Sequence, residues 1–256
     1  MLQFQRLTMD SSWHFSWEEA HFLADPWLLG SEIDGFRWLN EQWHTTPPVS
    51  PESLPDYAGI LISQSYQDHL HPQTLAQLRD DVPLLATEKA AKKLSRLFPG
   101  RRLMPIPHWS EKSPLQWQNL QWMAFAPPHR RDPVYYAVLI ANADRKAIFY
   151  APHGFHLSEA DRVFLQDWSV QVLMTTLTEF ALPAWMGGKV NPGLDNALEL
   201  ARVLRPHHLL NTHDEDKLMK GLVARLAKVQ RPDWDHLPAE LPYRPTPDYA
   251  PYSFDF

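Results

Sequence analysis

Cysteine is absent from the sequence, and its absence limits the kinds of site that the chain can build. A disulfide framework, an iron–sulfur cluster, a Cys-based zinc ribbon and a cysteine nucleophile are all excluded. Any transition-metal site must use imidazole and carboxylate ligands instead. The chain has 13 histidines and 30 acidic residues among its 256 residues, so these ligands are plentiful.

Basic charge and long apolar runs are also scarce. The sequence has 24 Lys and Arg against 30 Asp and Glu, a net charge of −6. Proteins that bind nucleic acids usually carry a basic face, so no nucleic-acid partner is expected. No apolar run reaches the roughly 20 residues of a membrane span, and the N-terminus lacks the apolar region of a signal peptide. We therefore expect a soluble, cytoplasmic protein that acts on a small molecule, in an oligomeric state that the sequence does not indicate.

The hydrophobic pattern alternates between short strands and helices. Strands are predicted within the first 25 residues and at 58–63, 83–86, 115–125 (two strands), 134–141, 146–150, 170–176 and 208–212. Helices are predicted at 72–80, 87–97, 192–204 and 214–229, with a capped helix start at 158–161. The helix at 214–229 has the clearest pattern, because acids precede leucines at helical spacing. This alternation is typical of an α/β fold.

The C-terminal segment differs in composition from the rest of the chain. Residues 232–256 contain six prolines together with several aromatic residues. A purely solvated tail would not need so many aromatic side chains. We therefore predict a domain over residues 1–231 and an extended strap over 232–256 that packs on it. The alternative is a disordered or partner-binding tail.

Residues with metal-ligand chemistry follow the apolar run at 58–63. Asp68 and His69 are adjacent, and His71 lies two positions further on. The ends of strands in α/β sheets are common places for ligand sites, and a turn would let the first two side chains face one pocket. The alternative is that Asp68 caps the following helix and that the histidines lie on the surface.

The segment around these residues resembles a known motif. Residues 54–78, LPDYAGILISQSYQDHLHPQTLAQL, are similar to the first metal-binding motif of the metallo-β-lactamase superfamily, H-x-H-x-D-H after a buried strand. The proline-bearing lead-in resembles that of the branch with ascorbate-phosphate lactonases and N-acyl-phosphatidylethanolamine phospholipases. Asp25-Pro26 resembles the Asp-Pro that ends an early strand in this superfamily. The resemblance covers roughly residues 5–230 and implies a four-layer αββα sandwich.

One of the two metal pockets that the resemblance implies has lost two of its three histidines. The first two histidines of the motif correspond to Gln64 and Tyr66, and the third histidine of the family corresponds to His129. Gln and Tyr are poor ligands for zinc, so this pocket is expected to be empty or very weak. Tyr66 would instead donate a hydrogen bond to an oxyanion, which is a role that phenols can play.

The other implied pocket keeps most of its ligands. The Asp-His pair of the motif is Asp68 and His69, and the last histidine of the family is His213. The bridging aspartate of the family is missing, and His153 is the residue that would replace it. These residues, with His129 as a further ligand, predict a site for one divalent ion. Zn²⁺ is the first candidate, and Mn²⁺ and Fe²⁺ are alternatives.

Further residues are weaker candidates for this site. His71, His156 and Gln64 lie near the matched positions and are possible additional ligands. The residues predicted to act in catalysis are Asp68, within the metal site, and Tyr66. Trp38 and Trp43 are candidates for the lining of an apolar substrate pocket, although most of the 11 tryptophans are expected in the core.

The resemblance leaves more than one function open. The first is a metal-dependent hydrolase of a small ester, lactone or phosphodiester that works with a single ion. The second is a non-catalytic member of the fold that uses the old cleft or the aromatic tail to bind a ligand or a partner. A nuclease function is disfavoured by the acidic balance of the chain.

Overall fold

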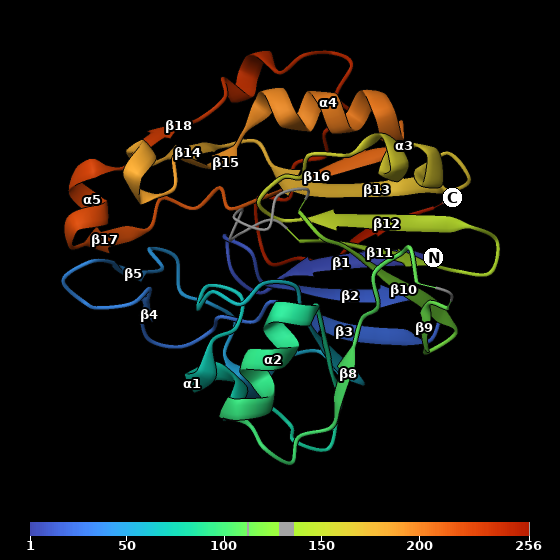
Figure 1. The fold of residues 1–256 in the computed structure, drawn as a ribbon, viewed down its shortest axis with the longest axis horizontal. Coiled ribbons are helices and arrows are strands. Elements are labelled where there is room, and N and C mark those ends of the chain that lie inside the picture. The colour runs from blue at the N-terminus through green and yellow to red at the C-terminus, as the bar shows by residue number, and fades with distance from the viewer. Residues whose placement is uncertain (112, 128–135, 256) are drawn as a thin grey trace.

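The structure described here is a computed structural model, and it describes residues 1–111, 113–127 and 136–255. Two central β-sheets stack face to face, and helices cover the outer face of each sheet (Figure 1). This arrangement confirms the four-layer αββα sandwich that the sequence predicts. His129 lies outside the described residues.

The first central sheet contains the N-terminal strands and a short strand from the C-terminus. In spatial order its strands are β19 (Tyr252–Phe254), β1 (Leu2–Arg6), β2 (Trp13–Trp17), β3 (Ala20–Ala24), β6 (Gly59–Ile62), β7 (Leu84–Ala86) and β8 (Leu103–Pro105). The pairs from β19 to β3 are antiparallel, whereas β3, β6, β7 and β8 run parallel. Parallel strands need crossover connections, and the helices on this face supply them.

The second central sheet is built from the later part of the chain. In spatial order its strands are β16 (His208–Thr212), β13 (Ser169–Thr176), β12 (Lys146–Ala151), β11 (Ala137–Ala141), β10 (Leu120–Phe125) and β9 (Leu115–Trp117). The strands predicted at 115–125 are confirmed as β9 and β10. Gln118 and Asn119, at the turn between them, have positive φ angles of 51° and 59°.

The helices form the two outer layers. On the first sheet lie α1 (Pro72–Leu75) and α2 (Glu88–Leu97), and on the second lie α3 (Glu159–Leu165) and α4 (Leu194–Leu204) (Figure 1). The predicted cap of α3 is confirmed, because the Ser158 side chain accepts a hydrogen bond from the backbone N–H of Asp161. Within the described residues, no helix is both long enough and apolar enough to cross a membrane.

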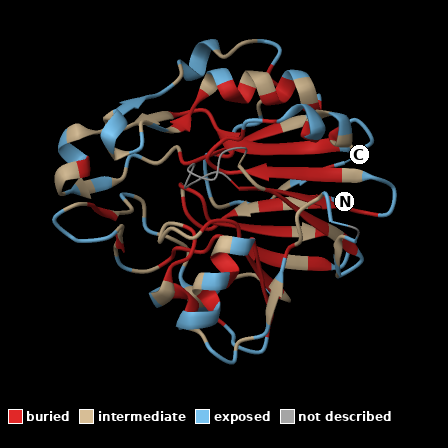
Figure 2. Ribbon diagram, in the orientation of Figure 1, coloured by how far each residue is buried: buried red, intermediate tan, exposed pale blue. Residues whose placement is uncertain are grey.

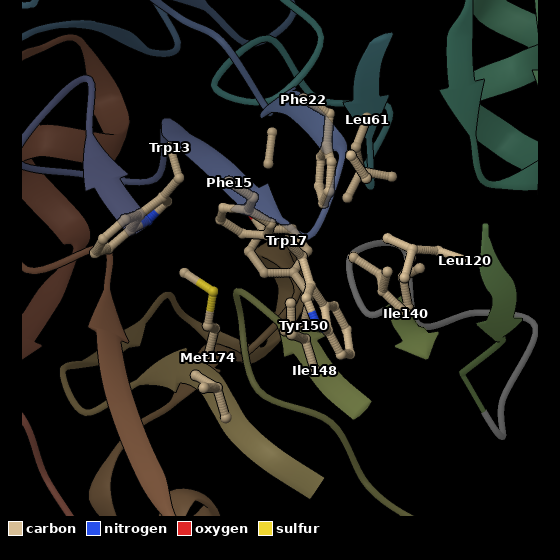
Figure 3. Close-up of a cluster of buried hydrophobic side chains, with 14 of the residues drawn as sticks. Trp13, Phe15, Trp17, Phe22, Leu61, Leu120, Ile140, Ile148, Tyr150 and Met174 are labelled. Atoms are coloured by element: carbon tan, nitrogen blue, oxygen red, sulfur yellow. The ribbon is translucent and has the colours of Figure 1, made fainter. Parts of the chain in front are cut away.

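Three apolar clusters hold the four layers together. One cluster fills the space between the two sheets and includes Phe15, Phe22, Ile148 and Tyr150 (Figure 3). Two others lie between each sheet and its helices. Most residues of the central strands are buried, whereas the edge strands β8, β9 and β19 are partly exposed (Figure 2). Burial of each large side chain contributes roughly 1.5–3 kcal/mol relative to exposure, so the two stacked faces are a major source of stability.

Two small sheets extend beyond one end of the sandwich. The first contains β17 (Leu218–Lys220), β5 (Glu41–Trp43) and β4 (Glu32–Ile33). The second contains β15 (Lys189–Pro192), β14 (Glu179–Ala181) and β18 (Lys228–Gln230). Short elements elsewhere are the helix α5 (Leu222–Leu226) and the 3-10 turns η1 (Pro51–Ser53), η2 (Ala184–Met186) and η3 (Trp234–His236).

The prediction of one long helix at 214–229 is wrong. This segment forms β17, α5 and β18, and Leu218 and Val229 are 61% and 45% exposed. Gly221 has a φ of 99°, and a Cβ there would lie 2.7 Å from the carbonyl oxygen of Leu39. Pairing of β17 with β5 and of β18 with β14 therefore replaces the helical hydrogen bonds, because tertiary contacts outweigh local helical spacing.

The C-terminal segment runs along the domain in extended form. Leu209 exchanges backbone hydrogen bonds with Pro242 and Arg244, and Phe254 is buried among the strands of the first sheet. Phe254 pairs with Leu2 in β1, which brings the two ends of the chain together. The domain boundary near residue 231 stays a prediction.

Candidate metal centre

Four of the predicted ligands lie together at the ends of the strands. Asp68, His69, His153 and His213 each offer one ligand atom, and these atoms all lie within 4.8 Å of one another. Asp68 and His69 follow β6 of the first sheet, whereas His153 and His213 follow β12 and β16 of the second. The cluster therefore forms where the ends of the two stacked sheets meet. The three imidazoles are buried, and Asp68 is half-buried.

The outer nitrogen of each imidazole faces an oxygen of a neighbouring side chain. Nδ1 of His69 lies 2.7 Å from Oδ2 of Asp25, and Nδ1 of His153 lies 2.7 Å from Oδ1 of Asn191. Nδ1 of His213 faces Oδ2 of Asp10 at 3.4 Å. These oxygens accept, so each ring carries its proton on Nδ1 and turns Nε2 toward the centre. Metal-binding histidines in proteins are held in this way.

The inner atoms of the cluster lack enough partners within the protein. Nε2 of His69 and Nε2 of His153 are 2.6 Å apart, and Oδ2 of Asp68 lies 3.5 Å and 3.8 Å from them. Oδ1 of Asp68 and Nε2 of His213 are buried without any hydrogen-bond partner. A buried polar atom without a partner costs about 1–3 kcal/mol. One proton shared between Nε2 of His69 and Nε2 of His153 satisfies these two atoms and leaves Asp68 and His213 without a partner. A divalent cation would satisfy all four side chains.

The charges of the cluster agree with a site that holds positive charge. Burial lowers the pKa of His69, but the carboxylates of Asp68 and Asp25 outweigh it and raise this pKa to about 9. Burial raises the pKa of Asp68, but the nearby histidines outweigh it and lower this pKa to about 2. Burial holds the pKa of His153 well below its usual range. The protein therefore favours one proton on His69 and none on His153, and a metal ion would displace that proton.

Asp25 ties the first sheet to the cluster. Besides His69, its carboxylate accepts hydrogen bonds from the backbone N–H and the hydroxyl of Ser63, at 2.7 and 2.5 Å, and from the Tyr150 hydroxyl at 2.8 Å. Asp25 directly follows β3 and has a left-handed φ of 48°, and His213 likewise has a φ of 53°. Such backbone conformations often occur at functional sites, where the surrounding structure holds them in place.

The loop that carries His153 depends on a glycine. Gly154 has a φ of 86°, and a Cβ there would lie 2.6 Å from Oδ1 of Asn196 and 2.7 Å from Cγ of Pro192. A larger residue at position 154 would clash with Pro192 of β15 and Asn196 of α4, and it would push the loop away from them. The close approach keeps His153 beside Asn191, which precedes Pro192 in β15.

The remaining predicted ligands lie outside the cluster. His71 caps α1, since its Nδ1 accepts from the backbone N–H of Thr74 at 3.2 Å, and its Nε2 lies 3.3 Å from the carbonyl oxygen of Ser31. His156 is exposed. Gln64 donates to the carbonyl oxygen of Tyr136 at 2.7 Å and accepts from its backbone N–H at 3.4 Å. The structure therefore gives His71 and Gln64 structural hydrogen bonds in place of the predicted metal contacts.

A cavity of about 310 Å³ opens beside the cluster. Its walls include Asp68, His153, His213 and Tyr66. Burial, together with Asp34 and Asp68, raises the pKa of Tyr66, so its hydroxyl keeps its proton and can donate. The predicted tryptophans do not line this cavity. Apolar parts of its wall come instead from Leu39, Phe180, Leu182, Met186, Val190, Met219, Val223 and Val229.

Residues that support the cluster were not predicted from the sequence. Asp10, Asn191 and Lys217 belong to segments far apart in the chain, and Nζ of Lys217 lies 2.8 Å from Oδ2 of Asp10. Asp10 thereby links His213 to the half-buried Lys217, whose charge lowers the pKa of Asp10 although burial alone would raise it. No local sequence motif marks these residues. Asp25 differs, because Asp25-Pro26 resembles the Asp-Pro found at the end of an early strand in the superfamily.

A cluster of histidines and aspartate at the strand ends of an αββα sandwich defines a metallo-hydrolase type of fold. A family profile described as "Beta-lactamase superfamily domain" matches residues 7–213, so the chain belongs to this family. The sequence matches none of the curated proteins with which it was compared.

Solved structures share the fold at low sequence identity. The metallo hydrolase Igni18 from the archaeon Ignicoccus hospitalis is 13% identical, with a TM-score of 0.69, 100% of this chain covered and 99% of that one. An isothiocyanate hydrolase from Delia radicum gut bacteria is 15% identical, with a TM-score of 0.60 and coverages of 82% and 84%. The diiron β-hydroxylase CmlA from Streptomyces venezuelae is 15% identical, with a TM-score of 0.62 and coverages of 83% and 45%. Because these proteins differ in reaction, the likeness shows the fold alone.

Proposed function

We propose that this protein is a metal-dependent hydrolase of a small ester, lactone or phosphodiester. One divalent ion would be held by Asp68, His69, His153 and His213, with Zn²⁺ as the first candidate and Mn²⁺ or Fe²⁺ as alternatives. The observation that carries the proposal is the inward arrangement of these ligand atoms, two of which have no other partner. Three N ligands and one O ligand suit each of these metals.

The side chains around the cavity supply the remaining parts of a hydrolytic site. When bound, the ion would supply Lewis-acid activation of water and of the reacting substrate oxygen. Tyr66 keeps its proton and lines the cavity, so it can donate a hydrogen bond to negative charge that develops on the substrate. Lys217 also lines the cavity, and its ammonium adds positive charge beside the cluster.

A single ion fits these residues better than two. The positions of the first two motif histidines hold Gln64 and Tyr66. The side-chain amide of Gln64 is already bound at both ends to the backbone of Tyr136. We therefore propose one ion per chain. The net charge of −6 supports a small-molecule substrate over a nucleic acid, and a cytoplasmic location is part of the same proposal.

Elemental analysis of the purified protein and its variants tests this function. We expect about one metal ion per chain in the wild type and little in His69→Ala, His153→Ala and His213→Ala, because each variant removes one ligand of a closed set. His236→Ala is the matched control, since the side chain of His236 is 81% exposed. Activity is then measured on 4-nitrophenyl esters, simple lactones and bis(4-nitrophenyl) phosphate.

Two results would count against the proposal. Absence of stoichiometric metal after incubation with Zn²⁺, Mn²⁺ or Fe²⁺ would contradict the metal site itself. Bound metal without turnover on the whole panel would favour the non-catalytic alternative, in which the cavity only binds a ligand.

A further inference from the structure

The two small sheets face each other across the cavity beside the metal cluster. In the first sheet, Gln42 pairs with Glu32 on one side and with Met219 on the other. Directly opposed residues of neighbouring strands point to the same face, so these side chains form one row. All three line the cavity, which identifies this row as one wall of it.

The second small sheet forms the opposite wall in the same way. Phe180 pairs with Asn191 on one side and with Val229 on the other, and all three line the cavity. Asn191 holds His153, so this row begins at the metal cluster and continues as an apolar surface. One wall is therefore apolar and the other carries a carboxylate.

Among the described residues, no cation lies within ion-pair distance of the carboxylates of Glu32 and Asp34 on the first wall, and only the more distant charges of Lys217 and Lys93 act on them. Glu32 is 1% exposed, and its Oε1 accepts from the Asn40 side chain at 3.0 Å, whereas its Oε2 is buried without a partner. Asp34 also lines the cavity. Within the described part of the chain, neither carboxylate forms an ion pair. Burial raises both pKa values, and nearby carboxylates add to it: Asp34 and Asp68 act on Glu32, and Asp68 acts on Asp34, whose pKa rises to about 6. A bound cation would relieve this cost.

The cations of the cavity wall are engaged with other carboxylates. Lys217 bonds Asp10 at 2.8 Å, and Arg231 bonds Asp216 at 3.0 Å. Lys189 pairs with Glu179 at 2.5 Å. The carboxylate of Glu215, which also lines the cavity, is bonded to His44 and to the backbone N–H groups of Thr45 and Thr46. The carboxylates without such partners are therefore the proposed metal ligand Asp68 and the pair Glu32 and Asp34.

A protonated amine suits this pair better than a second metal ion. Among the described residues, the cluster with metal-ligand spacing contains neither Glu32 nor Asp34. An ammonium group donates three hydrogen bonds of about 2.7–2.9 Å and can reach carboxylates that are too far apart to coordinate one ion. The apolar wall beyond Asn191 suits the uncharged body of the same molecule.

We propose that the cavity selects substrates with an apolar body and a cationic amino group, with Glu32 and Asp34 binding the amine. Phe180 and Val229 contact the apolar body, which places the reacting bond between them and the metal cluster. This inference rests on the proposed hydrolase function for its chemistry. The binding preference itself can be measured without turnover.

Binding of matched six-carbon probes tests the preference. Isothermal titration of n-hexylamine, 1-hexanol and hexanoate into the metal-loaded full-length protein compares a cation, a neutral group and an anion on the same apolar chain. We expect hexylamine to bind at least about tenfold more tightly than the other two, because hydrogen bonds to charged groups exceed neutral ones by this order. Glu32→Gln and Asp34→Asn should each remove about tenfold of that preference and leave hexanol binding unchanged.

The controls separate this inference from the proposed function. Glu52→Gln replaces an exposed carboxylate and should bind all probes as the wild type does. Equal affinity for the three probes, or an amine preference that survives both substitutions, would overturn the inference. The inference would also be overturned if the His213→Ala protein bound Mn²⁺ or Ca²⁺ and lost this binding when Glu32→Gln was added. That result would indicate a second cation site. Metal binding and turnover without a preference for the amine would support the proposed hydrolase function and refute only the proposed substrate preference.

Discussion

The carboxylate of Asp25 accepts a hydrogen bond of 2.7 Å from Nδ1 of His69. This contact fixes both the orientation of the ring and the nitrogen that carries its proton. Nε2 is thereby left to face the centre of the cluster. Because Asp25 directly follows β3 and His69 follows β6, the pairing of these two strands sets the geometry of the first proposed ligand.

Replacement of Asp25 by Asn should weaken metal binding without removing a ligand. The amide would place N–H groups against donors from Ser63 and Tyr150 and would no longer fix the His69 ring. Loss of such supporting groups typically costs 10- to 100-fold in metal affinity. Competition with a zinc chelator measures this change. Asp81→Asn, at a carboxylate that is 64% exposed, is the control and should bind as the wild type does. Equal affinities in the two variants would show that Asp25 does not support the metal site.

Metal removal should destabilise the protein, and this effect should depend on His213. Zn²⁺ at 1,000 times its dissociation constant stabilises a folded state by about 4 kcal/mol, which corresponds to roughly 10 °C in the midpoint of unfolding for a chain of this size. Addition of Zn²⁺ to EDTA-treated protein should therefore raise the midpoint by this amount. His213→Ala should show little rise, and His236→Ala should behave as the wild type. A full rise in His213→Ala would mean that the stabilising ion binds elsewhere.

The sequence points to the proposed ligands more directly than to the residues that support them. Asp68 and His69 follow a buried strand within a motif, and His213 follows a late strand, so each of these proposed ligands is visible within one segment. Asp10 and Asn191 make their contacts only after distant strands come together, and no local pattern marks them. His71 resembles a ligand by position but caps a helix, because the choice between these roles depends on the direction of its ring.

The fold shows the same division between local and distant causes. The helix at 87–97 and the strands near it follow from capping and apolar runs, and the structure has them within a residue or two. The segment 214–229 has helical spacing, yet it is divided into two short strands and the short helix α5, because β5 and β14 offer edges for pairing. The apolar residues at helical spacing share no buried face there, since Leu218 and Val229 are exposed and Leu222 and Leu226 are only half-buried.

Restoration of a motif histidine at position 64 should not restore a second metal pocket. Gln64→His would remove the amide that bonds both backbone groups of Tyr136. Leaving one of these buried groups unpaired costs about 1–3 kcal/mol, so the variant should be less stable by that amount. Urea unfolding measures the stability, and elemental analysis should still give about one ion per chain. Gln77→His, at an exposed position of the same residue type, is the control. A second equivalent of tightly bound metal in Gln64→His would contradict this interpretation.

Replacement of Asp34 by Asn should stabilise the metal-free protein at neutral pH. Burial and the nearby Asp68 raise the pKa of Asp34 from 3.8 to about 6. Between these two values the folded state binds more protons than the unfolded state, so stability falls as the pH rises through this window. Asn cannot ionise and avoids this loss. Urea unfolding in EDTA should show Asp34→Asn more stable than the wild type by about 1–3 kcal/mol at pH 7, with a smaller difference at pH 4. Asp167→Asn, at a side chain that is 75% exposed, should follow the wild-type pH dependence. A difference that does not depend on pH would show that Asp34 is ionised at little cost, and the cavity would then hold its negative charge without needing a bound cation.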